Sequence, residues 1–126
     1  MRAVVDDSGF SDAVSEIGNS FEHFIHLPAF PFARISVAIA ELRAGVNVTG
    51  IRPIDEVKKI GPRPLFIIHC AGDTIVPPSH SQALFAAAAE PKSIWLLPQG
   101  GHIDARTLDP VEYARRVIAF FSEALR

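Results

Sequence analysis

Cysteine is nearly absent from this chain of 126 residues, which contains only Cys70. A single cysteine excludes an internal disulfide and fits a reducing, cytoplasmic environment. The sequence also lacks any run of about 18 apolar residues, the length that a membrane helix needs. The apolar stretch at its start is too short for a signal peptide, and Asp6 and Asp7 follow it at once. These absences predict a soluble, cytoplasmic protein with no membrane segment.

Long basic runs are also missing, because no run of Lys or Arg exceeds two residues. Twelve basic and fourteen acidic side chains give a formal net charge of −2. This charge pattern argues against a nucleic-acid partner or an anionic membrane surface. A metal site is not predicted either, because His102 and Asp104 have no third potential ligand at a suitable spacing. We also expect no cofactor. With 48% hydrophobic and 21% charged residues, the chain is predicted to be globular, and its length fits one domain.

Apolar strands alternate with amphipathic helices along the chain. Short strands are predicted over 3–5, 65–68 and 94–97, and the second is typical of a strand buried on both faces. Helices are predicted over 35–44, 53–60, 79–89 and from 110 to the end. This order predicts an α/β fold in which a short parallel sheet of about three strands is flanked by helices.

Two helical regions carry more specific signals. Asp109, Pro110 and Glu112 resemble a capping box at the start of the last helix. Its packing face is predicted to contain Ala114, Val117, Ile118, Phe121 and Leu125. Earlier in the chain, residues 10–32 hold five of the nine phenylalanines, with two prolines that break any long helix. This segment is predicted to be lid-like, and its phenylalanines could line an acyl pocket or belong to the core.

Asp73 and His102 are the candidate catalytic residues. Each follows a predicted parallel strand, and neighbouring parallel strands end at the same edge of a sheet. Their side chains are therefore expected within hydrogen-bond reach. An aspartate on one imidazole nitrogen fixes the tautomer and stabilises the imidazolium, so that the other nitrogen can take a proton from a hydroxyl. The alternatives are a helix-capping role for Asp73 and a surface or packed position for His102. His69 is interpreted as a structural hydrogen-bonding residue at the end of its strand.

No nucleophile is predicted in this chain, because no Gly-x-Ser-x-Gly motif precedes Asp73. Ser8 lies between Asp7 and Gly9, without the first glycine and the following helix that a nucleophile elbow needs. Cys70 is interpreted as a small buried thiol rather than a nucleophile.

Three motifs occur in order. Residues 69–77 read His-Cys-Ala-Gly-Asp-Thr-Ile-Val-Pro, residues 100–102 read Gly-Gly-His, and the last helix has Pro-x-x-Tyr at 110–113 and an aromatic pair at 120–121. They resemble the C-terminal half of an α/β-hydrolase fold serine hydrolase of the esterase/peptidase-like superfamily, although Cys70 replaces that family's glycine. Residues 3–12 look like the family's strand after the nucleophile helix. The resemblance implies that strands six to eight are present, and that strands one to five, the nucleophile elbow and the oxyanion-hole loop are absent.

By this resemblance, 1–126 is a single partial α/β-hydrolase domain. Strand six and its turn occupy residues 1–12, and a lid-like helical insertion occupies residues 13–61. Residues 62–126 form a strand-helix-strand-helix unit that carries the acid and the histidine of the triad. The full-length form is expected to hydrolyse an ester, thioester or amide in a small-molecule or peptide substrate. Asp73 would orient His102, which acts as general base and then general acid. Without its serine, the chain is expected to be a truncated and inactive C-terminal fragment.

Two other interpretations stay open. The chain could be a non-catalytic binding subunit, or half of a split hydrolase, because the strand Ala3–Val5 would form a bare sheet edge. Such an edge invites pairing with a separate N-terminal half or with a second copy. Alternatively, the chain is an ordinary small α/β domain whose motif matches are coincidental. The substrate is not predicted, because an acyl pocket and oxyanion hole would be built mostly by residues outside the chain.

Overall fold

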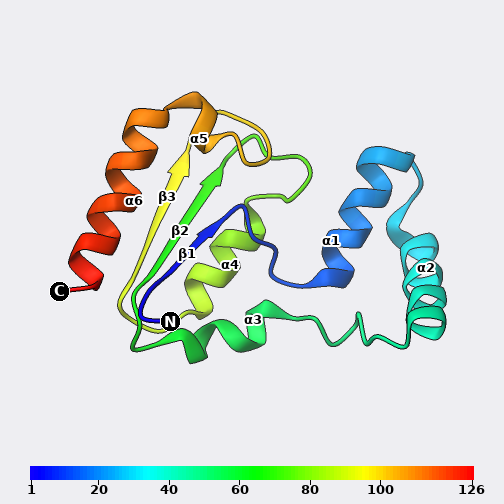
Figure 1. Cartoon of the computed structure of the whole chain (residues 1–126). Coiled ribbons are helices and arrows are strands. Elements are labelled where there is room, and N and C mark those ends of the chain that lie inside the picture. Colours follow the sequence, from blue (N-terminus) through cyan, green and yellow to red (C-terminus); the bar gives the residue numbers. More distant parts are fainter.

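A three-stranded parallel sheet with the order β1-β2-β3 forms the centre of the computed structural model, which describes residues 1–126 (Figure 1). The strands are β1 (Val4–Asp7), β2 (Leu65–Cys70) and β3 (Lys92–Leu97). The predicted α/β fold with a short parallel sheet is confirmed. The first strand is longer than predicted, because Asp6 and Asp7 pair with Ile67 and Ile68 and the turn begins only at Ser8.

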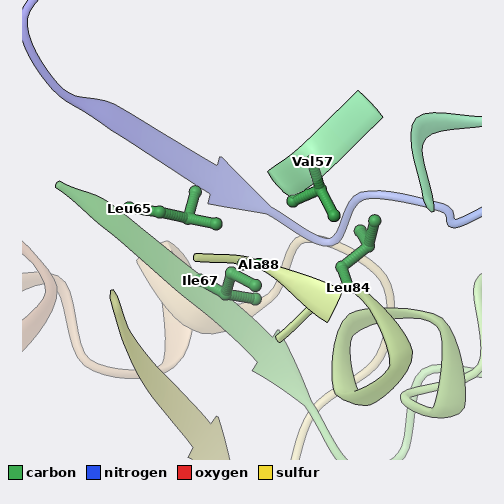
Figure 2. Packing of buried hydrophobic residues seen from close by; sticks show 5 residues of the cluster. All are labelled: Val57, Leu65, Ile67, Leu84 and Ala88. Carbon is green, nitrogen blue, oxygen red and sulfur yellow. The ribbon is translucent and has the colours of Figure 1, made fainter. Parts of the chain in front are cut away.

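The central strand β2 is buried along its whole length, as its continuous apolar sequence predicted. Alternate side chains of a strand point to opposite faces, so β2 contributes to two separate cores. On one face it packs under α3 (Pro53–Glu56), the 3₁₀ turn η2 (Val57–Ile60) and α4 (Ser79–Ala87), through Val57, Leu65, Ile67, Leu84 and Ala88 (Figure 2). On the other it packs under α5 (Ala105–Leu108) and α6 (Pro110–Ala124), through Phe66, Ile68, Cys70, Leu97 and Ala105.

Helix α6 begins as predicted but packs with a different face. The Asp109 carboxylate accepts a hydrogen bond from the Glu112 backbone N–H at 3.0 Å. The reciprocal half of a capping box is missing, because the Glu112 side chain binds Arg115 and Arg116 instead. Against the sheet lie Tyr113, Val117 and Phe120. Ala114, Ile118 and Leu125 are exposed, so the predicted packing face is partly wrong. The helix is apolar on more than one side, and the narrow sheet covers only one of them.

Residues 13–44 form a helical unit beside the sheet, with α1 (Ala13–Ser20), the π-helical turn η1 (Phe21–Ile25) and α2 (Ala29–Ala44) (Figure 1). The Asp12 carboxylate caps α1 by accepting from the Ser15 N–H at 2.8 Å. Phe30 is non-helical within α2 because Pro31 follows it and disfavours the helical conformation. Pro31 therefore bends the start of α2 rather than ending it. As predicted, α2 ends at Gly45, whose φ of 65° suits glycine.

Much of the apolar surface of this helical unit faces outward. Leu42 of α2 is 86% exposed, and Ile35 and Ile39 on the same face are about half exposed. Phe24, Phe30 and Phe32 are also exposed, so they do not belong to a core of this chain. No single helix is long and apolar enough to cross a membrane. Only the segment of α1 and η1 combined with α2 reaches the required length and apolar composition, and these two segments are bent by 114° relative to each other.

Candidate functional site

The loops after β2 and β3 leave the same edge of the sheet and touch each other. The Ala71 N–H, one residue after the end of β2, donates at 2.8 Å to the carbonyl of Leu97, the last residue of β3. A Cβ on Gly72 would lie only 2.8 Å from the Gly100 carbonyl oxygen. A glycine at position 72 therefore allows the two loops to approach closely. This approach places the residue after Gly72 next to the loop that carries His102.

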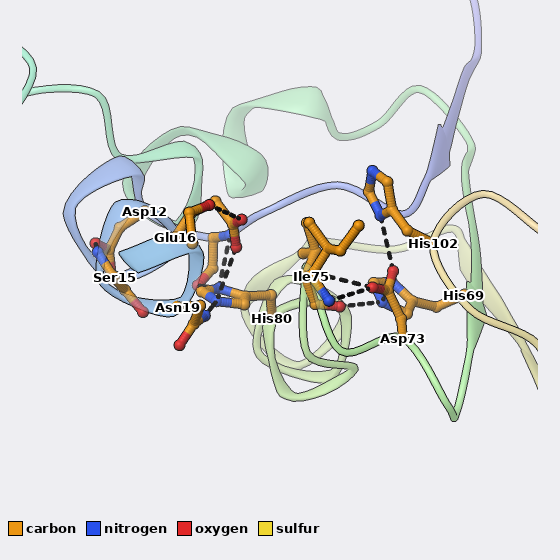
Figure 3. A network of polar contacts seen from close by, with 12 residues as sticks. Asp12, Ser15, Glu16, Asn19, His69, Asp73, Ile75, His80 and His102 are labelled. Atoms are coloured by element: carbon orange, nitrogen blue, oxygen red, sulfur yellow. Dashed lines mark hydrogen bonds and ion pairs between the residues drawn. The ribbon is translucent and has the colours of Figure 1, made fainter. Parts of the chain in front are cut away.

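Asp73 and His102 are hydrogen-bonded, with 2.9 Å between Asp73 Oδ2 and His102 Nδ1 (Figure 3). The other carboxylate oxygen, Oδ1, accepts from the backbone N–H groups of Ile75 and Val76 at 3.0 and 2.9 Å. The carboxylate thus caps its own turn rather than helix α4. The Asp73 side chain is fully buried, whereas that of His102 is 26% exposed. Nε2 of His102 makes no hydrogen bond within the chain and is free to face a reactant.

His69, the next-to-last residue of β2, lies beside the carboxylate of this pair (Figure 3). Its side chain is fully buried, and Nε2 lies 2.8 Å from the Val76 carbonyl oxygen and 3.3 Å from Asp73 Oδ2. The hydrogen-bonding role predicted for His69 is therefore present in its contact with Val76, and the carboxylate oxygen that binds His102 lies near the same nitrogen.

The two alternative nucleophiles, Cys70 and Ser8, make no hydrogen bond with His102. Cys70 is fully buried, and burial raises the pKa of its thiol, an effect that the carboxylates of Asp104, Asp7 and Asp73 reinforce. The thiolate, which is the nucleophilic form, is thus disfavoured. Ser8 is 5% exposed, and its hydroxyl donates to Asp7 Oδ1 at 3.2 Å. No hydrogen bond joins either residue to His102, and no group of three potential ligands is arranged to hold a metal ion.

A hydrogen bond that the sequence did not reveal joins α6 to the end of β1. The Tyr113 hydroxyl donates to Asp7 Oδ2 at 2.9 Å across 106 positions in sequence. Burial raises the pKa of Tyr113, and both the hydrogen bond to Asp7 and its charge add to the effect. The tyrosine of the Pro-x-x-Tyr motif thus has a partner, but no local pattern points to a residue so distant in sequence.

A second unforeseen group of polar residues attaches the helical unit to the sheet domain. His80 of α4 is 5% exposed, and its Nδ1 lies 2.7 Å from Ser11 Oγ and accepts from the Ser11 N–H at 3.2 Å. Its Nε2 lies 3.1 Å from the side-chain amide of Asn19 in α1 (Figure 3). Glu16 is 3.9 Å from the same nitrogen, and burial raises the pKa of its carboxyl group. One buried imidazole therefore connects α4, α1 and the turn after β1.

An apolar cavity of about 320 Å³ lies between β1, α3 and α4. Val4, Phe10, Ile60 and Leu84 are among its lining residues. Asp6 also lines it, and the buried Oδ2 of this residue has no hydrogen-bond partner. Burial raises the pKa of the Asp6 carboxyl group. The cavity is separate from the Asp73–His102 pair, and its buried carboxylate lowers the stability of the chain when it is charged.

Comparison with known sequences gives short matches to uncharacterized proteins. No protein-family model matches the chain. The uncharacterized protein YfhR of Escherichia coli strain K12 is 43% identical over 49 residues, which cover 39% of this chain and 17% of YfhR. The uncharacterized protein YqkD of Bacillus subtilis is 27% identical over 94 residues, 75% of this chain and 30% of YqkD. The chain thus spans less than a third of the length of these curated relatives.

Comparison with solved structures identifies the fold. An esterase of Pyrococcus furiosus, Pf2001, superposes with a TM-score of 0.73 and 20% identity over the whole chain and 46% of the esterase. Acetyl xylan esterase 1 from Thermoanaerobacterium superposes with a TM-score of 0.68 and 17% identity, again over the whole chain and 39% of that enzyme. At these identities the likeness concerns the fold alone. The three parallel strands and their helices form a partial α/β-hydrolase fold.

Proposed function

We propose that this chain provides the acid and the histidine of a serine-hydrolase site that acts on an ester, thioester or amide. Asp73 orients His102, which acts as general base toward a serine hydroxyl and then as general acid toward the leaving group. The nucleophilic serine belongs to residues outside these 126, so the chain alone does not turn over substrate. On this proposal the chain is the C-terminal part of the catalytic domain.

The observation that supports this proposal is the 2.9 Å contact between a fully buried carboxylate and an imidazole that is partly exposed. The carboxylate has partners for both oxygens, so its orientation is fixed. The histidine then presents its second nitrogen outward, which is the arrangement that a general base needs. The esterase folds of the structural neighbours favour acyl transfer as the reaction class.

Labelling with a fluorophosphonate tests the absence of a nucleophile in the chain. The isolated protein is expected to form no adduct, and denatured protein gives the background. A stoichiometric adduct on any of its own serines would overturn the assignment of the nucleophile to other residues.

The catalytic roles are tested in a polypeptide that also carries a Gly-x-Ser-x-Gly segment. The DNA upstream of the Met1 codon, read in all frames, shows whether such a segment is encoded there. In the joined polypeptide, hydrolysis of a p-nitrophenyl ester is expected, and Asp73→Asn should lower kcat by a factor of about 10⁴, as expected when the imidazole takes the wrong tautomer. Unchanged hydrolysis in that variant would exclude the proposed role of Asp73.

A second candidate is a non-catalytic interaction subunit or half of a split hydrolase. The outer edge of β1 has no neighbouring strand, and an open edge pairs readily with another chain. Co-purification with a Gly-x-Ser-x-Gly protein would favour a split enzyme. A folded dimer that stays inactive with such a protein present would favour a binding role instead.

A further inference from the structure

His69 is a polar residue in the least accessible part of the molecule. It lies on the central strand of the sheet, and none of its side chain is exposed. A buried imidazole loses its hydration, and this cost must be offset by hydrogen bonds within the protein. The one hydrogen bond of the His69 side chain, and its close contact with Asp73, both lead to the turn that carries Asp73 (Figure 3).

The tautomer of His69 follows from its contacts. The Val76 carbonyl oxygen, 2.8 Å from Nε2, can only accept a hydrogen bond. The hydrogen therefore resides on Nε2 and is donated to this carbonyl, and Asp73 Oδ2 lies 3.3 Å from the same nitrogen. Nδ1 is buried and has no hydrogen-bond partner in the chain. In its neutral form the ring thus directs its one N–H toward the Asp73 turn.

The Asp73 carboxylate accepts three hydrogen bonds and has one further close contact, with the His69 ring. Oδ1 accepts from Ile75 and Val76, whereas Oδ2 accepts from His102 Nδ1 and lies 3.3 Å from His69 Nε2. Val76 connects His69 to Asp73 through two hydrogen bonds, because its N–H donates to Asp73 while its carbonyl accepts from His69. Rotation of the carboxylate would break all of these contacts together.

We propose that His69 is a positioning residue for the Asp73–His102 pair. It acts through the Asp73 turn, by fixing Val76, whose N–H binds Oδ1, and by its close contact with Oδ2, and it has no contact with a substrate. A catalytic consequence rests on the proposed hydrolase function, whereas the positioning itself is a property of this chain and is measured without turnover.

The test is NMR spectroscopy of the 126-residue protein with ¹⁵N-labelled imidazoles. The wild type is expected to show the Nε2–H tautomer of His69 and a slowly exchanging Nδ1–H signal from His102. His69→Leu removes the donor and should abolish the His102 signal while the backbone spectrum stays that of a folded chain. His69→Gln carries an amide N–H near the position of Nε2 and should retain the signal. His69→Asn, whose side chain is shorter, should lose it.

Two results would overturn the positioning role. One is a His102 Nδ1–H signal of unchanged position and intensity in the folded His69→Leu protein. The other is the Nδ1–H tautomer of His69 in the wild type, which is measurable even if the leucine variant fails to fold. The hydrolase proposal fails independently, through fluorophosphonate labelling or lack of turnover in the joined polypeptide, and such a failure leaves these NMR signals unchanged.

Discussion

At the scale of single residues, the close contact of Gly72 with Gly100 determines how near Asp73 lies to His102. A side chain at position 72 would meet backbone, which cannot move aside as a flexible side chain does. We expect Gly72→Ala to lower the free energy of unfolding by about 1–3 kcal/mol and to weaken the His102 Nδ1–H signal.

Gly50→Ala is the matched control for this substitution, since its Cβ would meet only the side-chain amide of Asn47 on the surface. Urea unfolding and imidazole NMR of both variants measure the effect. Equal behaviour of the two alanine variants would show that the loops tolerate a wider separation.

The buried carboxylate of Asp6 gives the chain a pH dependence of known sign. Burial raises the native pKa of Asp6 above its usual value of 3.8, so between 3.8 and the raised pKa the native chain binds more protons than the unfolded chain. The free energy of unfolding therefore gains a contribution from Asp6 as the pH falls through the raised pKa toward 3.8. Asp6→Asn, which lacks this titration, should be more stable than wild type at neutral pH.

Urea unfolding of wild type and Asp6→Asn at several pH values between 7 and 4 measures this effect. The stability difference should shrink as the pH falls. Glu16, whose pKa is also raised, is present in both proteins and cancels in the difference. A difference that stays constant with pH would contradict the assignment to Asp6.

The sequence predicted the two residues of the candidate pair and the hydrogen-bonding role of His69, but not the long-range contacts that join the surrounding elements. Asp73 and His102 each follow an apolar strand, and parallel strands bring their ends together, so their proximity follows from local patterns. The contacts of Tyr113 with Asp7 and of Ser11 with His80 join positions far apart in sequence. Such contacts depend on how each helix packs against the sheet, which the periodicity of apolar residues in the sequence does not specify.

At the scale of elements, helix α6 depends on the Asp109 cap at its start. Asp109→Ala removes the acceptor for the Glu112 N–H and should lower the free energy of unfolding by about 0.5–2 kcal/mol. Asp109→Ser keeps a capping oxygen and is the control, with stability close to wild type. Thermal unfolding followed by circular dichroism measures both, and wild-type stability of the alanine variant would show that α6 is held by packing alone.

The boundaries of several helices were predictable, whereas α1 and α5, and the faces that the helices bury, were not. Gly45 and Pro53 mark helix boundaries through backbone geometry, which is local. Which stripe of α2 or α6 is buried depends on what lies beside it. Ile39 and Ile118 are exposed in this chain although each belongs to an apolar stripe.

At the scale of the whole molecule, the open edge of β1 is the expected site of association. The N–H groups of Val4 and Ser8 donate toward β2, so by alternation along the strand those of Val5 and Asp7 face the open edge. Val5→Pro removes a donor from that edge and should weaken association with a partner strand. Val4→Pro instead removes a bond within the sheet and should mainly lower stability.

Sedimentation velocity over a range of concentrations, alone and with a co-purifying partner, separates these two outcomes. Association of the Val5→Pro protein as strong as that of the wild type would show that contacts elsewhere, such as the exposed face of α2, hold the partner.

The pairing of β1 with β2 also has a consequence for how the chain folds. Val4 pairs with Leu65, so this contact closes a loop that contains the entire helical unit, whereas β2 reaches β3 through α4 alone. Closing a longer loop costs more chain entropy, and contacts between distant positions slow folding. We therefore expect β2, α4, β3 and α6 to form an early nucleus and β1 to dock late, which keeps its outer edge accessible to a partner during synthesis and refolding.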